Sequence, residues 1–119
     1  MTETTPLSVT PFLPADQAGA TLEDWGPLPE ATGPEMATSG LTLWAQDGQE
    51  VGIWECAPGP SRWTLETNEM VHLLAGRMTV TADGEPARQI GPGDTAVFPR
   101  GWTGTWDIHE PVRKLYVIF

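Results

Sequence analysis

The chain has 119 residues, enough for one domain with its own core and too few for two. Its 6 Lys and Arg against 16 Asp and Glu give a formal net charge of −10, which repels phosphate backbones and anionic membranes. We therefore expect neither a nucleic-acid nor a membrane partner. The single cysteine, Cys56, cannot form an internal disulfide, and no run of residues is apolar enough for a signal or a membrane span. These features predict a cytoplasmic protein with a buried, structural thiol.

Residues 1–38 are predicted to form an irregular arm that packs on the rest of the domain. Prolines and glycines recur throughout this segment and prevent a long helix or strand. Leu22, Trp25 and Leu28 are spaced by three residues, which indicates a short turn on the surface, and Leu7–Leu13 is a candidate short strand. A wholly disordered tail is the competing interpretation, and Trp25 argues against it.

Residues 39–119 are predicted to form an all-β domain. Asp47-Gly48 and Asp83-Gly84 each separate two β-type runs, and Asp-Gly between strands is a strong hairpin signal. Short strands at such intervals, without an amphipathic helical stretch, favour an antiparallel sandwich or small barrel. The expected strands are 39–45, 50–56, 69–74, 77–82, 86–90, 94–98, 102–108 and 112–119.

Two spacings carry a resemblance to a known family. Glu69 is followed by six residues and Gly76, in E-M-V-H-L-L-A-G-R-M-T-V, and Gly93 is followed by five residues and P-R-G. Both resemble the two motifs of the cupins. The phrases G-I-W-E-C-A-P-G, G-P-G-D-T-A-V-F-P-R-G-W-T-G-T-W and R-K-L-Y-V-I resemble the branch with the ureidoglycine aminohydrolase and ethanolamine-utilisation cupin domains. The resemblance implies a small antiparallel β-barrel or jelly-roll sandwich over residues 39–119.

The resemblance also implies where a metal would bind, because metal-binding cupins supply three histidines and one glutamate. Only Glu69 matches that set. The first two histidine positions fall on Trp63 and Leu65, or on Arg62 and Thr64, and the third falls on Gly104. Side chains alternate along a strand, so His72 points away from the face that carries Glu69. We therefore expect no metal cofactor, with a weakly held divalent transition metal as the alternative.

The same alternation predicts a cavity in the barrel. Trp102, Gly104 and Trp106 share the inward face, and the missing side chain of Gly104 is expected to leave room for a ligand. The predicted ligand-binding residues are Trp63, Glu69, Trp102, Gly104, Trp106 and Tyr116, whereas Trp44 and Trp54 are expected in the core. A buried carboxylate needs a partner, and the candidate partners of Glu69 are Arg62, Arg100 and Tyr116.

Three functions fit these residues. The first is a metal-free binding protein for a small metabolite, with tryptophans for stacking and Glu69 for orientation. The second is an enzyme of the ureidoglycine aminohydrolase-like type that acts on a small nitrogen-containing metabolite, with Glu69 as a catalytic acid or base or with a weakly held metal. The third is a protein whose cavity is closed by tryptophan and whose role is association. The outward apolar residues Met70 and Leu74 also predict a homodimer, as the resemblance implies.

Overall fold

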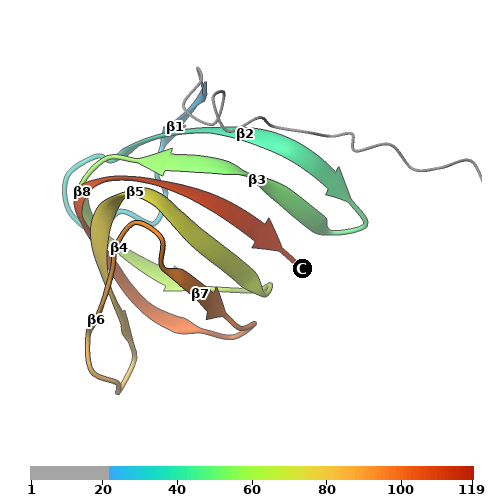
Figure 1. Cartoon of the computed structure of the whole chain (residues 1–119). Helices are drawn as coiled ribbons and strands as arrows, with labels where there is room; N and C mark the ends of the chain where they lie inside the picture. Colours follow the sequence, from blue (N-terminus) through green and yellow to red (C-terminus); the bar gives the residue numbers. More distant parts are fainter. Residues whose placement is uncertain (1–21) are drawn as a thin grey trace, which may run out of the picture.

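Residues 22–119 of the computed structural model are described, and the candidate strand at Leu7–Leu13 lies outside them. Within this range every regular element is a strand and all the pairs are antiparallel, which confirms the predicted fold class (Figure 1). The eight strands are β1 (Glu23–Pro27), β2 (Ala37–Gln46), β3 (Gln49–Cys56), β4 (Gly59–Thr64), β5 (Glu69–Ala82), β6 (Arg88–Ile90), β7 (Thr95–Phe98) and β8 (Thr103–Ile118).

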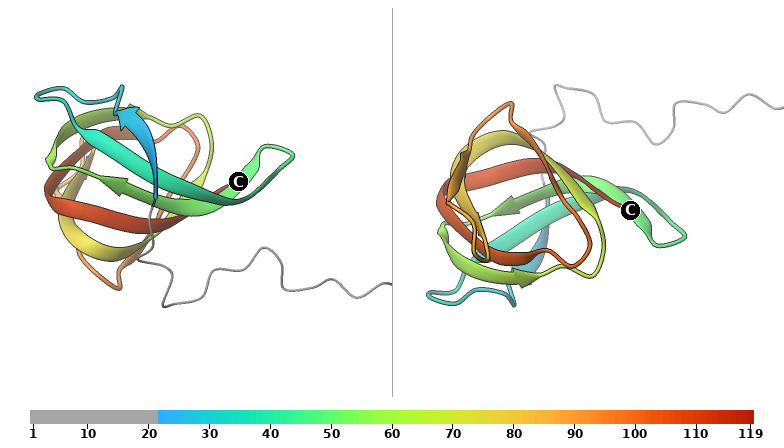
Figure 2. Two further views of the ribbon diagram at one scale, coloured as in Figure 1. Left: turned by 90° about the horizontal axis from the view of Figure 1, so that it is seen from above. Right: turned by 90° about the horizontal axis from the view of Figure 1, so that it is seen from below.

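Two long bent strands, β5 and β8, join the two halves of the domain. The end of β8 pairs with β3 and its beginning pairs with β4, while the two ends of β5 pair with β7 and β6. Figure 1 shows β8 curving from the lower half into the upper one, and Figure 2 shows the strands encircling a common core. The expectation of separate strands at 69–74 and 77–82, and at 102–108 and 112–119, was therefore wrong.

The bend in β5 and β8 has a local cause. The register between them shifts repeatedly from Leu73 to Met78. Gly76 lies at this point with a φ of +89°, and a Cβ atom there would lie 2.2 Å from the carbonyl oxygen of Pro111. Because only glycine tolerates both conditions, Gly76 allows the two strands to turn the corner together.

Other turns follow the sequence closely. Asp47 and Gly48 have φ values of +53° and +80° and close a two-residue hairpin between β2 and β3, as predicted. The second Asp-Gly pair opens a longer loop, since β6 begins only at Arg88. The strand β4 was not predicted, because its first residues, Gly59 and Pro60, read as a turn.

Glu23–Pro27 form the strand β1 where the sequence predicted a surface turn. β1 pairs with β2, and the ring of Trp25 lies over Gly40, where a Cβ atom would come within 2.2 Å of the indole. Trp25 therefore packs on the body of the domain. The division of the chain at residue 38 remains a prediction.

The core fills the space between the two halves. Alternate residues of β5 and β8 point into it, so Val71, Leu73, Ile108 and Val112 are almost completely buried. The remaining core residues come from all parts of the described chain: Leu28, Met36, Cys56, Met78, Val80, Ile90, Phe98, Trp106 and Tyr116.

Candidate functional site

A buried ion pair lies at one end of the core. Glu69, the first residue of β5, accepts a hydrogen bond on Oε2 from Nζ of Lys114 on β8, at 2.7 Å. Glu69 is 9% exposed and Lys114 is 4% exposed. Glu69 thus points inward as predicted, with Lys114 as its partner. Taking two charges out of water costs several kilocalories per mole for each ion, so this pair is an unusual feature of a small core.

The hydrogen bond to Glu69 comes from Lys114 and not from any of the three expected partners, so that expectation was wrong. Arg62 forms a bidentate ion pair with Asp83, both about half exposed, and its hydrogen bonds lower the pKa of the Asp83 carboxyl. The side chain of Tyr116 donates to Oε2 of Glu50, and Arg100 is exposed.

The ammonium group of Lys114 also lies over two indole rings. Its Nζ atom is 4.5 Å from the ring centroid of Trp54 and 4.5 Å from that of Trp106. Trp63 stacks on Trp106 with centroids 4.3 Å apart, and its Nε1 donates to Ser61 Oγ at 2.7 Å. Indole faces attract cations, so these rings stabilise the buried ammonium alongside Glu69.

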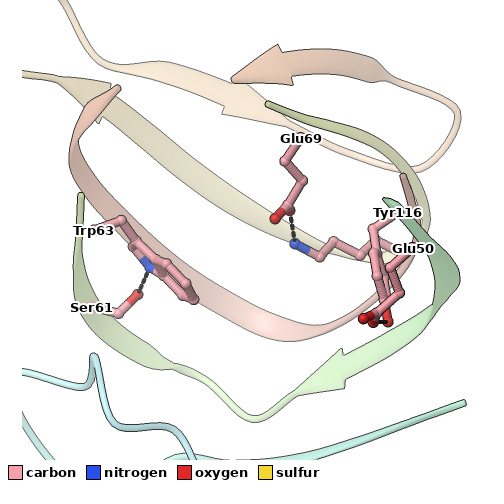
Figure 3. Close-up of polar contacts among 6 residues, drawn as sticks. Glu50, Ser61, Trp63, Glu69 and Tyr116 are labelled. Atoms are coloured by element: carbon pink, nitrogen blue, oxygen red, sulfur yellow. Dashed lines mark hydrogen bonds and ion pairs between the residues drawn. The ribbon is translucent and has the colours of Figure 1, made fainter. Parts of the chain in front are cut away.

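A pocket of about 200 Å³ lies against Glu69, Lys114, Trp54 and Trp63. Figure 3 shows Trp63 on one side of the site and the hydrogen-bonded pair Tyr116 and Glu50 on the other, with Glu69 between them. Burial, reinforced by the hydrogen bond to the Glu50 carboxylate, raises the pKa of Tyr116 far above its usual value, so its hydroxyl stays a donor. The pocket is lined by Trp25, Glu50, Trp54, Trp63, Glu69, Lys114, Tyr116 and Ile118.

The structure brings together only part of the predicted site. Trp63, Glu69 and Tyr116 line the pocket. Trp106 is 1% exposed and lies behind the wall, against Trp63 and Lys114. Trp102 lies in a different place, in a second cavity of about 670 Å³ between β6 and β7, together with Phe98 and Ile90.

The prediction that Gly104 leaves room for a ligand was wrong. A Cβ atom at Gly104 would lie 2.2 Å from the carbonyl oxygen of Thr81 and 2.6 Å from the indole of Trp102. The space is already filled by β5 and by the Trp102 ring. Gly104 therefore allows two strands and an indole to approach closely, and it does not open a chamber.

Five residues of the pocket were missed, and two of them had a signal. Lys114 and Ile118 each lie two positions from Tyr116 on one strand, so an inward Tyr116 already implied that both point inward. Glu50 reaches the pocket because β3 pairs with β8, which places Glu50 opposite Ile118. Trp54 was expected in the core but is half-buried and lines the pocket, and Trp25 comes from the arm, whose path no local pattern predicts.

The donor atoms near Glu69 do not suit the metal that other cupins hold. Nδ1 of His72 contacts Thr95 Oγ1 at 2.8 Å and Nε2 of His109 contacts Thr79 Oγ1 at 2.7 Å, both on the exposed surface. Over residues 22–119, no three His, Cys, Asp or Glu side chains gather closely enough to hold a metal ion. Cys56 is buried, as predicted, and burial raises the pKa of its thiol to about 11, so it is a poor ligand.

Comparisons with known proteins agree with this fold. No curated protein matches the chain significantly. A protein of unknown function of the DUF861 family from Pseudomonas syringae pv. tomato is 20% identical with a TM-score of 0.78, over 86% of this chain and 46% of its own length. The chain therefore spans less than half of that protein.

Two further structures are similar. Ethanolamine utilization protein Q (EutQ) from Salmonella typhimurium is 24% identical with a TM-score of 0.65, over 79% of this chain and 76% of its own. A DUF861 family protein from Thermotoga maritima is 37% identical with a TM-score of 0.54, over 56% of this chain and 76% of its own.

No helix within residues 22–119 is long and apolar enough to cross a membrane. The family model of the EutQ-like cupin domain matches residues 44–116, which is more than half of the sequence. This match covers β3 to β7, most of β8 and only the end of β2, and it includes Glu69 and Lys114. The chain therefore belongs to the EutQ-like cupin family.

Proposed function

We propose that this protein binds a small metabolite in the pocket that contains Glu69 and Lys114. The observation that carries the proposal is the buried ion pair in a pocket that four aromatic side chains also line. A buried ion pair contributes little net stability compared with well-packed apolar residues. A few polar groups in a mainly apolar pocket are instead the usual arrangement for orienting a ligand.

The size of the pocket limits the ligand. Pockets that take drug-sized molecules are about 300–1,000 Å³, whereas this one is about 200 Å³. A metabolite with few non-hydrogen atoms fits such a space. Trp54 and Trp63 offer ring faces for its apolar part, and Glu69 offers a hydrogen-bond acceptor for its polar part.

We also propose that the pocket works without a metal. The carboxylate of Glu69 is held by the Lys114 ammonium, which supplies the positive charge that a metal would supply in other cupins. For an enzyme of the ureidoglycine aminohydrolase-like type, Glu69 would have to give up this partner before it could act as a base. The binding function therefore fits the geometry better.

A thermal-shift panel of amino acids, amines, small carboxylates and polyols tests the proposal, because a ligand of the folded state raises Tm. Trp54→Leu alters the pocket, and Trp102→Leu is the matched control in the other cavity. We expect at least one compound to stabilise the wild type and Trp102→Leu but not Trp54→Leu. The opposite pattern would place the site in the other cavity, and a panel without any stabilising compound would contradict the proposal.

A homodimer remains a proposal, supported by the outer face of the sheet. Cross-strand partners share a face, and the pairs Val97–Met70, Met70–Val117, Val117–Val51 and Val51–Trp44 form one apolar row across five strands. Val97 is 58% exposed. An apolar row of this length suits contact with a second copy of the chain.

A further inference from the structure

We infer that the ligand of the pocket is a small organic cation, an alkylammonium compound; this inference rests on the proposed binding function. The walls are the first reason. Trp25, Trp54, Trp63 and Tyr116 contribute four aromatic side chains to a single pocket of about 200 Å³. Aromatic faces attract ammonium groups, and several rings around a small space are the arrangement by which proteins bind methylated amines.

The acceptors in the pocket are the second reason. Two carboxylates, Glu50 and Glu69, line the same small space, against the single ammonium of Lys114. The pocket therefore carries an excess of negative charge. Glu50 accepts a hydrogen bond from Tyr116 on Oε2, and Glu69 accepts one from Lys114 on Oε2. An ionised carboxylate can accept about four hydrogen bonds, so both have capacity for donors from a ligand.

The state of Lys114 is the third reason. An ammonium has three N–H donors, and Nζ of Lys114 faces three partners: the Glu69 carboxylate at 2.7 Å and the rings of Trp54 and Trp106, each at 4.5 Å. Its donors are therefore already engaged, so an anionic ligand would have to displace Glu69. The same contacts show that indole faces in this part of the domain accept an ammonium group.

Three small probes of different charge separate the possibilities. Choline is a cation, 3,3-dimethyl-1-butanol is its neutral isostere with carbon in place of nitrogen, and butyrate is an anion. Each is titrated into the full chain at constant ionic strength, with the tryptophan fluorescence of the pocket as the readout. We expect choline to bind at least about tenfold more tightly than the neutral isostere, which corresponds to about 1.4 kcal/mol.

Charge variants locate the effect. Glu50→Gln keeps an oxygen acceptor for Tyr116 but removes one negative charge, and we expect at least about fivefold weaker choline binding with unchanged binding of the isostere. Glu110→Gln makes the same charge change at an exposed position of β8 and should leave choline binding unaltered. Equal effects of the two variants would overturn the inference, since they would indicate only the overall charge of the protein.

The outcomes for the inference and for the proposed function differ. If butyrate or the neutral isostere binds as tightly as choline, the ligand is not recognised as a cation, and the metabolite pocket stands. The same conclusion follows if choline does not bind while a neutral or anionic compound of the thermal-shift panel stabilises the wild type but not Trp54→Leu. The inference of a cationic ligand then falls, and the metabolite pocket stands. If neither the probes nor the panel binds at the pocket, both proposals fall.

Discussion

Replacing Lys114 by methionine tests whether the ion pair between Glu69 and Lys114 is as well shielded from solvent as the structure indicates. Methionine fills a similar volume without charge, and Glu69 then remains buried alone. With the two residues only 4% and 9% exposed, solvent screens the charge poorly. Removal of one partner from a buried pair costs about 3–5 kcal/mol. At about 4 °C per kcal/mol for a domain of this size, Tm should fall by about 12–20 °C.

The double variant Lys114→Met, Glu69→Met is the matched control. With both charges removed the cost of an unpaired ion disappears, so we expect a stability within about 1 kcal/mol of the wild type, or greater. Urea unfolding at pH 7, followed by tryptophan fluorescence, gives the four free energies of the double-mutant cycle when the single variant Glu69→Met is measured as well. If Lys114→Met alone lies within about 0.5 kcal/mol of the wild type, the pair is not buried in solution and the reasoning fails.

Three further predictions address other parts of the domain. Gly104→Ala places a Cβ atom 2.2 Å from the Thr81 carbonyl oxygen and should lower the free energy of unfolding in urea by about 1–3 kcal/mol. Gly91→Ala, where a Cβ atom would meet nothing within 4 Å, should change it by less than about 0.5 kcal/mol. Equal effects of the two variants would show that β5 and β8 do not approach so closely at Gly104. Burial raises the pKa of Cys56 from 9.0 to about 11, so the unfolded chain loses this proton first and stability should fall as the pH rises from about 9 to 11. This loss of stability between about pH 9 and 11, at most about 2.7 kcal/mol, should be smaller in Cys56→Ala. If the stability of Cys56→Ala depends on pH in the same way as that of the wild type, the prediction is contradicted. Val97→Glu should convert the proposed dimer to a monomer in sedimentation, and an unchanged species, whether dimer or monomer, would argue against this face.

The inward and outward faces of the strands could be predicted from the sequence because side chains alternate with a period of two. Once Glu69 was placed inward, Val71 and Leu73 had to follow, and all three are buried. The hairpin at Asp47-Gly48 was also predictable, since few residue pairs accept two positive φ values.

The pocket was harder to predict because it depends on contacts between distant strands. The partner of Glu69 was sought among arginines and a tyrosine, although an inward Tyr116 implied an inward Lys114 two positions earlier on the same strand. The break assumed at Glu110 and Pro111 hid the continuity of β8. Gly104 was misread because the close approach of Thr81 comes from β5, and one strand's pattern carries no information about its neighbour's distance.

A crystal structure of the full chain grown with choline tests the central claim most directly. The account predicts density for the ligand between Trp54 and Trp63, with its nitrogen within about 6 Å of their ring centroids and close to the carboxylates of Glu50 and Glu69. Choline bound instead in the cavity beside Trp102, or a pocket that holds only water at saturating choline, would contradict it.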